Sequence, residues 1–184
     1  MQTAHEFFIH ELNDILDGEN QILQALGEQA KESDRPELRK AFEQHRAQTE
    51  KQIDRLEQCL DEIGEEPQTT QCAGIRGIIQ EHTSFKAENP ADDILDIFNV
   101  GAATKIERYE ITAYESLIRL AQLMKHRKAV QLLTQNLREE QQMLKKAEGF
   151  SKKLKPEQLG MGEQEEEEAP VRRRTRAGAR RRAA

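Results

Sequence analysis

The chain has 184 residues, of which 36% are hydrophobic, 34% are charged and 4% are aromatic, and it has no tryptophan. This composition argues against a β-sandwich or barrel, which needs more Val, Thr and aromatic residues, and favours long amphipathic helices. The net charge of −6 combines an acidic main part with an arginine-rich end, and no apolar run approaches the ~20 residues that span a membrane.

Turn signals divide the chain into five expected helices. Ser-Asp-Arg-Pro at 33–36, Gly-Glu-Glu-Pro at 64–67 and Asn-Pro at 89–90 interrupt the helical pattern, and residues 125–127 form a weaker break. We therefore expect helices near 3–32, 36–63, 72–87, 91–124 and 127–154, the third of them short.

The first expected helix has apolar residues at spacings of three and four, which is the packing seam of a helix bundle. This seam consists of Phe8, Leu12, Ile15, Ile22 and Leu26. Glu19 takes a place in it where the pattern calls for an apolar residue.

The second expected helix has a less regular seam. Its residues are Leu38, Phe42, His45, Thr49, Ile53, Leu56 and Leu60. Glu50 lies beside this seam, whereas His45 lies in it. His45 is therefore a metal ligand, a hydrogen-bond donor to a ligand, or a histidine that a neighbouring helix satisfies.

The last two helices carry glutamates in the same way. Glu110 interrupts the seam of the helix at 91–124, and Glu107 lies three residues earlier on the same face. Glu140 interrupts the seam of the final helix, next to Glu139.

A short pattern repeats between the two halves of the chain. The spacing from Glu19 to Leu26 returns in the spacing from Glu110 to Leu117. Two similar helical hairpins explain this repeat, and the connection between them then has to cross the bundle, with the short helix in it.

An ionised carboxylate inside a bundle costs several kcal/mol unless a cation compensates it. Each glutamate alone has simpler explanations, such as a bundle end, a salt bridge with a facing lysine, or a polar residue that fixes the packing. Four long helices that each place a carboxylate on or beside the seam favour a shared interior site for two divalent cations. The candidate ligands are Glu19, Glu50, Glu107, Glu110 and Glu140, with His45 and Glu139 as further candidates.

Several stretches resemble the ferritin-like proteins of the YciE/YciF type, and the resemblance spans residues 5–150. They include Phe-Ile-His-Glu-Leu-Asn-Asp at 8–14, Thr-Glu-Lys-Gln-Ile at 49–53, Cys-Ala-Gly-Ile at 72–75 and Lys-Ile-Glu-Arg-Tyr-Glu-Ile at 105–111. Di-iron carboxylate bundles place a Glu on each of two helices and Glu-x-x-His on the other two. This sequence contains no Glu-x-x-His on a bundle helix, so its match to that template is partial.

The resemblance implies an all-α, ferritin-like four-helix bundle at 1–155, with a short extra helix in the crossover between helices two and three. It also implies two metal ions, with iron favoured over manganese, a homodimer, and a stress-linked bacterial role as a ferroxidase. The family often has Glu or His near positions 47 and 50, and Ala47 departs from this pattern.

The tyrosines and cysteines allow more than one interpretation. Tyr109 and Tyr114 either serve near an oxidising metal or pack with a polar tip. Cys59 and Cys72 are expected as small buried hydrophobic residues of a protein in a reducing compartment. The start of the chain lacks the basic and long apolar regions of an export signal, so we expect a cytoplasmic protein.

The composition changes after Lys155. Residues 156–184 hold a glutamate run and then the Arg-rich end from Arg172 to Arg182, and they offer little to bury, so we expect a disordered tail. Its arginines either pair with the glutamates and aid solubility or contact the phosphates of nucleic acid.

Two functional hypotheses fit these observations. The first is a di-iron enzyme that oxidises Fe(II) with dioxygen or peroxide. The second is a non-catalytic, stress-associated bundle that acts through its dimer surface or through DNA contacts of the Arg-rich tail.

Overall fold

The computed structural model describes residues 1–33 and 35–153, and within these ranges the chain forms five α-helices and no strand. They are α1 (Ala4–Glu32), α2 (Pro36–Glu62), α3 (Ala73–Lys86), α4 (Asp92–Leu123) and α5 (Arg127–Ser151). The all-helical prediction is confirmed, and the largest difference in bounds is that α5 ends at Ser151 instead of 154. The expected tail at 156–184 lies outside the described residues, so its separation from the bundle stays a prediction.

Local signals explain where the helices begin and end. The Thr3 side chain accepts a hydrogen bond from the Glu6 backbone, and the Glu6 carboxylate accepts one from the Thr3 backbone, which together cap α1. Pro36 occupies the first turn of α2, where its missing N–H costs nothing. Asn89 and Lys125 take positive φ angles of 54° and 63°, which end α3 and α4 before the next helix starts.

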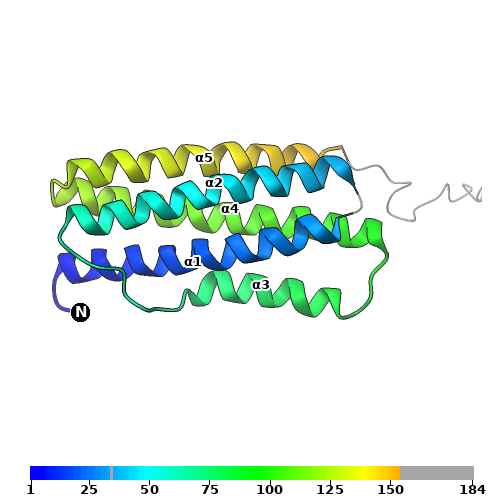
Figure 1. Cartoon of the computed structure of the whole chain (residues 1–184), viewed down its shortest axis with the longest axis horizontal. Helices are drawn as coiled ribbons and strands as arrows, with labels where there is room; N and C mark the ends of the chain where they lie inside the picture. Colours follow the sequence, from blue (N-terminus) through cyan, green and yellow to red (C-terminus); the bar gives the residue numbers. More distant parts are fainter. Residues whose placement is uncertain (34, 154–184) are drawn as a thin grey trace, which may run out of the picture. The chain divides into compact units, whose positions relative to one another are not determined.

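The four long helices form a bundle in which α1 packs against α2, α2 against α5, α5 against α4, and α4 against α1. Figure 1 shows that α1 and α5 run in one direction and α2 and α4 in the other. Because α2 and α4 are parallel, the chain has to return along the bundle between them, and α3 lies in this return, packed on α1 and α4. The predicted crossover is therefore confirmed.

The extra helix α3 approaches α1 closely because Gly18 has no side chain. A Cβ atom at Gly18 would lie 3.2 Å from Ile75 Cγ1 and 3.5 Å from Cys72 Sγ. The backbone N–H of Cys72 also donates to Asp17 Oδ2 at 2.7 Å. These contacts fix the segment of α1 that carries Glu19.

The apolar core has two separate parts along the bundle. One includes Phe8, Leu12, Ile15, Leu56, Leu117 and Leu133, and the other includes Ile22, Leu26, Leu38, Phe42, Val100 and Ile106. Burial of each such side chain contributes about 1.5–3 kcal/mol. On α1, Glu19 lies between the two parts, and on α4 Glu107 and Glu110 do so, which places a polar layer in mid-bundle.

Two further predictions concern the thiols and the membrane. Cys59 and Cys72 are both unpaired and fully buried, as expected of small hydrophobic residues. Among the described residues, no helix combines the length and the apolar character needed to cross a bilayer.

Candidate metal centre

The polar layer contains two groups of three side chains that can each hold one metal ion. The first group is His45, Glu107 and Glu140, and the second is Glu19, Glu110 and Glu140. In each group one ligand atom per residue lies within 4.8 Å of the others, and none of the residues is more than 3% exposed. Because Glu140 belongs to both groups, one carboxylate with two oxygens can serve two neighbouring ions.

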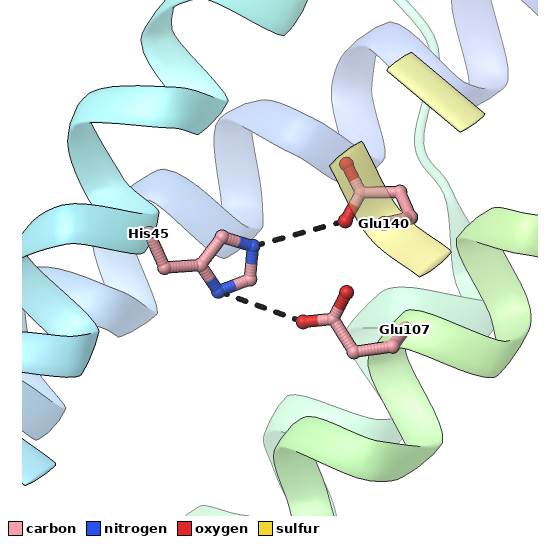
Figure 2. A group of neighbouring side chains, drawn as sticks. All are labelled: His45, Glu107 and Glu140. Atoms are coloured by element: carbon pink, nitrogen blue, oxygen red, sulfur yellow. Dashed lines mark ion pairs between the residues drawn. The ribbon is translucent and has the colours of Figure 1, made fainter. Parts of the chain in front are cut away.

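The first group combines a nitrogen ligand with carboxylate oxygens. His45 Nδ1 lies 3.5 Å from Glu107 Oε1, and His45 Nε2 lies 3.9 Å from Glu140 Oε2. Figure 2 shows the imidazole of α2 facing these two carboxylates, which come from α4 and α5. Three different helices therefore meet at this group.

The second group has oxygen ligands only. Glu19 of α1 accepts a hydrogen bond from the Tyr114 hydroxyl through Oε1. Both carboxylate oxygens of Glu110 are buried without a hydrogen-bond partner among the described residues. The two groups therefore offer different donor sets to the two ions.

Burial and mutual repulsion make the carboxylates of both groups hard to ionise. Burial, with the negative charge of Glu140, raises the pKa of Glu19 to about 8. Burial also raises the pKa of Glu140 to about 7, and it raises the pKa values of Glu107 and Glu110 well above the ordinary range, with further contributions from neighbouring carboxylates. A metal ion reverses this effect because it stabilises the ionised carboxylates.

Burial acts on His45 in the opposite direction. Burial, together with the positive charge of Lys146, lowers the pKa of the imidazole to about 4. The ring is therefore neutral at pH 7, which is the form that binds a metal ion.

Buried carboxylate oxygens without a hydrogen-bond partner indicate whether these residues fit metal ions. Within the two groups, five buried carboxylate oxygens have no hydrogen-bond partner among the described residues: Glu19 Oε2, Glu107 Oε2, Glu110 Oε1, Glu110 Oε2 and Glu140 Oε2. A buried acceptor without a donor is costly, and here several such acceptors belong to neighbouring glutamates of the two groups. The residues present thus fit divalent cations.

A hydrogen-bond network orients the two groups. Gln52 Nε2 donates to Glu140 Oε1. Asn136 Nδ2 donates to the Tyr114 hydroxyl at 3.0 Å, and Tyr114 in turn donates to Glu19. Arg55 extends the network by donating to Asn136 Oδ1 at 2.8 Å.

Sequence reasoning missed Gln52 and Asn136. A helical signal for both exists, because Gln52 lies two turns after His45 on one face of α2, and Asn136 lies one turn before Glu140. Tyr114, for which two roles were open, is fully buried and bonded to a candidate ligand.

The expectation that Glu50 points into the bundle is wrong. Its side chain is 54% exposed, and its Oε1 atom lies 3.8 Å from Arg46 Nη2 on the outside of α2. Thr49 occupies the inward position and is fully buried, and the next residue on a helix lies about 100° further round. Glu139 also lies outside both groups, where Arg55 holds it through two hydrogen bonds of 2.8 and 3.0 Å.

Comparison with known proteins places this bundle among a set of relatives. Residues 3–160 match the family described as "Domain of unknown function (DUF892)". Protein YciF of Escherichia coli (strain K12) is 33% identical over 141 residues, which is 76% of this chain and 85% of that protein.

Solved structures share the fold. The crystal structure of the E. coli stress protein YciF superposes with a TM-score of 0.80 at 28% identity, covering 88% of this chain and 100% of the other. YcfI from Rhodopseudomonas palustris superposes with a TM-score of 0.78 at 33% identity, covering 80% of this chain and 94% of the other.

Proposed function

The chain belongs to the family of the domain of unknown function DUF892, and on this premise we propose that it is a di-metal carboxylate protein that oxidises Fe(II). The pair of buried ligand groups that share Glu140 carries this proposal. The relative from E. coli is described as a stress protein, which supports a stress-linked role for this ferroxidase.

The donor set favours iron, with manganese as the alternative. Imidazole and carboxylate ligands suit both metals. Two Fe(II) ions give up one electron each, and with two protons these electrons reduce dioxygen to hydrogen peroxide, or hydrogen peroxide to two waters. The carboxylates of the chain offset the positive charge, which rises as the iron is oxidised, and Tyr114 and Gln52 hold Glu19 and Glu140 in place.

Anaerobic loading with Fe(II) tests the proposal. Metal-free protein should bind two Fe(II) per chain by titration calorimetry, and ferric absorption should rise after air is admitted. Glu110→Ala should lose the absorption, whereas Glu50→Ala should match the unmodified protein because Glu50 lies outside both groups. Background binding that is equal in the unmodified protein and in Glu110→Ala would contradict the proposal, and metal analysis of freshly purified protein identifies the native ion.

A non-catalytic role is the second candidate. Seven arginines lie between Arg172 and Arg182, and such a segment can attract DNA phosphates in a salt-dependent way. Deletion of residues 163–184 should then abolish a DNA mobility shift that weakens as salt rises. If neither protein shifts DNA, a tail-mediated role is excluded.

We further propose a cytoplasmic homodimer. The two buried, unpaired thiols are in the state that a reducing compartment maintains, and the resemblance to the YciE/YciF type supports the dimer. Sedimentation equilibrium of the full chain should give twice the mass of 21.2 kDa, and a single-chain mass would remove the dimer from the proposal.

A further inference from the structure

A small cavity reaches the first ligand group from one end of the bundle. Its volume is about 30 Å³, and side chains of α2, α4 and α5 line it. His45 and Glu107 form part of this lining, and most of the rest is apolar, including Phe42, Val100 and Met143. Two candidate ligands therefore face a mostly apolar cavity.

The size of the cavity limits what it can hold. A water molecule needs roughly 10–15 Å³ measured in this way, so about two water-sized molecules, or one diatomic molecule, fit inside. Apolar cavities of proteins stay dry and bind apolar gases such as xenon. A polar occupant would need several hydrogen-bond partners, and here the polar side chains are confined to His45, Glu107 and Lys146.

The charge of the lining argues against a metal ion as the occupant. Lys146 is exposed on α5, and its Nζ atom lies 3.6 Å from Met143 Sδ, inside the lining. A divalent cation would have to pass this ammonium group and shed its water against apolar side chains, and both steps are unfavourable. Neither step hinders a small neutral molecule.

We propose that this cavity binds dioxygen and delivers it to the His45–Glu107 end of the centre, which makes dioxygen the oxidant in place of peroxide. The inference rests on the proposed Fe(II) oxidation. Dioxygen is apolar and matches most of the lining, whereas hydrogen peroxide would find carboxylate or imidazole acceptors for its O–H groups only at Glu107 and His45. Two Fe(II) ions would supply one electron each, and with two protons these would convert dioxygen to hydrogen peroxide and leave two Fe(III).

Xenon tests the cavity without iron or activity. The metal-free full chain, labelled with ¹³C at its methionine methyl groups, should show a chemical-shift change at Met143 when the solution is saturated with xenon. Met124, which packs on the other core cluster, serves as the internal control. Xenon that leaves the Met143 signal unchanged would overturn the inference.

Variants of the lining test delivery. Ala103 also lines the cavity, so Ala103→Leu should fill it. This variant should lower the rate of Fe(II) oxidation at low dioxygen about fivefold or more, while the rate with added hydrogen peroxide and the calorimetric Fe(II) affinity stay unchanged. Met143→Ala enlarges the cavity and should strengthen the xenon effect, measured through ¹²⁹Xe exchange. The matched control for Ala103→Leu is Ala47→Leu, which introduces the same side chain at an exposed site of α2.

The outcomes separate this inference from the proposed function. If Ala103→Leu prevents xenon binding but leaves the dependence of the oxidation rate on dioxygen unchanged, delivery through the cavity is overturned. Fe(II) oxidation by the protein still stands in that case. A xenon effect in a protein that oxidises no Fe(II) with any oxidant overturns the proposed function and leaves an apolar gas site.

Discussion

Tyr114 links the ligand groups to the polar network behind them. Its hydroxyl donates to Glu19 and accepts from Asn136, and all three side chains are buried. Tyr114→Phe keeps the ring but leaves both partners without this bond, so it should lower the free energy of unfolding by about 1–3 kcal/mol. Urea unfolding of the metal-free protein measures the change.

Tyr109 provides the matched control for this substitution. Its hydroxyl makes longer contacts of 3.4 Å to Cys72 Sγ and Asp14 Oδ2, and its side chain is half-buried. Tyr109→Phe should therefore lower the free energy of unfolding less than Tyr114→Phe does. An equal loss of free energy of unfolding in both variants would contradict a stabilising role for the hydrogen bonds around Glu19.

The buried carboxylates make the stability of the metal-free protein depend on pH. The pKa of Glu19 is raised from 4.5 to about 8, so the folded state keeps a proton that the unfolded state has lost. Stability is therefore highest below pH 4.5 for this group and is lost as the pH rises towards 8. His45 acts in the opposite sense between pH 4 and 6.5, because its folded pKa is lowered to about 4.

Above pH 6.5 only the carboxylate effect remains among these groups. From pH 6.5 to 8 the free energy of unfolding of the metal-free protein should fall by about 1.4 kcal/mol per pH unit for each group that keeps its proton. Urea unfolding in the presence of a chelator measures this slope. With saturating metal the slope should disappear, because the folded carboxylates are then ionised, and a slope that persists would contradict the assigned cause.

At the scale of elements, the packing of α3 on α4 depends on Gly74. A Cβ atom at Gly74 would lie 2.4 Å from Tyr109 Cε2, so the Tyr109 ring or the two helices would have to shift. Gly74→Ala should lower the free energy of unfolding by about 1–3 kcal/mol and speed amide exchange in α3. Gly77 lies on the same helix with no atom within 4 Å of such a Cβ, so Gly77→Ala should raise stability by about 0.5–1 kcal/mol.

The helices and most of the carboxylates could be predicted because both signals are local. Apolar spacing defines a seam, and Glu19, Glu110 and Glu140 stand out because each interrupts one. On α2 no glutamate interrupts the seam, so sequence reasoning chose Glu50 beside it, although the inward positions hold His45 and Thr49.

The bonding partners could not be predicted, because they join helices far apart in the sequence. Gln52 meets Glu140 across 88 positions, and Tyr114 meets Glu19 across 95. A polar residue on a seam shows that something must satisfy it, but only the packed bundle shows which atom does so.

At the scale of the molecule, metal binding should stabilise the whole bundle. A ligand at a hundred times its Kd adds about 2.7 kcal/mol, which for a chain of this size raises Tm by about 5–10 °C. Mn(II) is a suitable probe because it stays reduced in air. Differential scanning calorimetry measures the shift.

Variants of single ligands should change this stabilisation in steps. Glu140→Gln removes a ligand from both groups and should abolish the shift, whereas His45→Gln affects only the first group and should leave one ion bound. Glu50→Gln should behave like the unmodified protein. Equal losses in His45→Gln and Glu140→Gln would contradict the role of Glu140 as the shared ligand.

Glu140 also lies late in the chain, on the last helix, and neither ligand group is complete without it. During synthesis α1 and α2 leave the ribosome first, carrying Glu19 and His45 but no full set of ligands. A nascent chain therefore cannot trap an ion from the cell's metal pool at either group until α5 has emerged and docked. In the proposed di-metal protein, the order of the helices would therefore make metallation the last step of maturation.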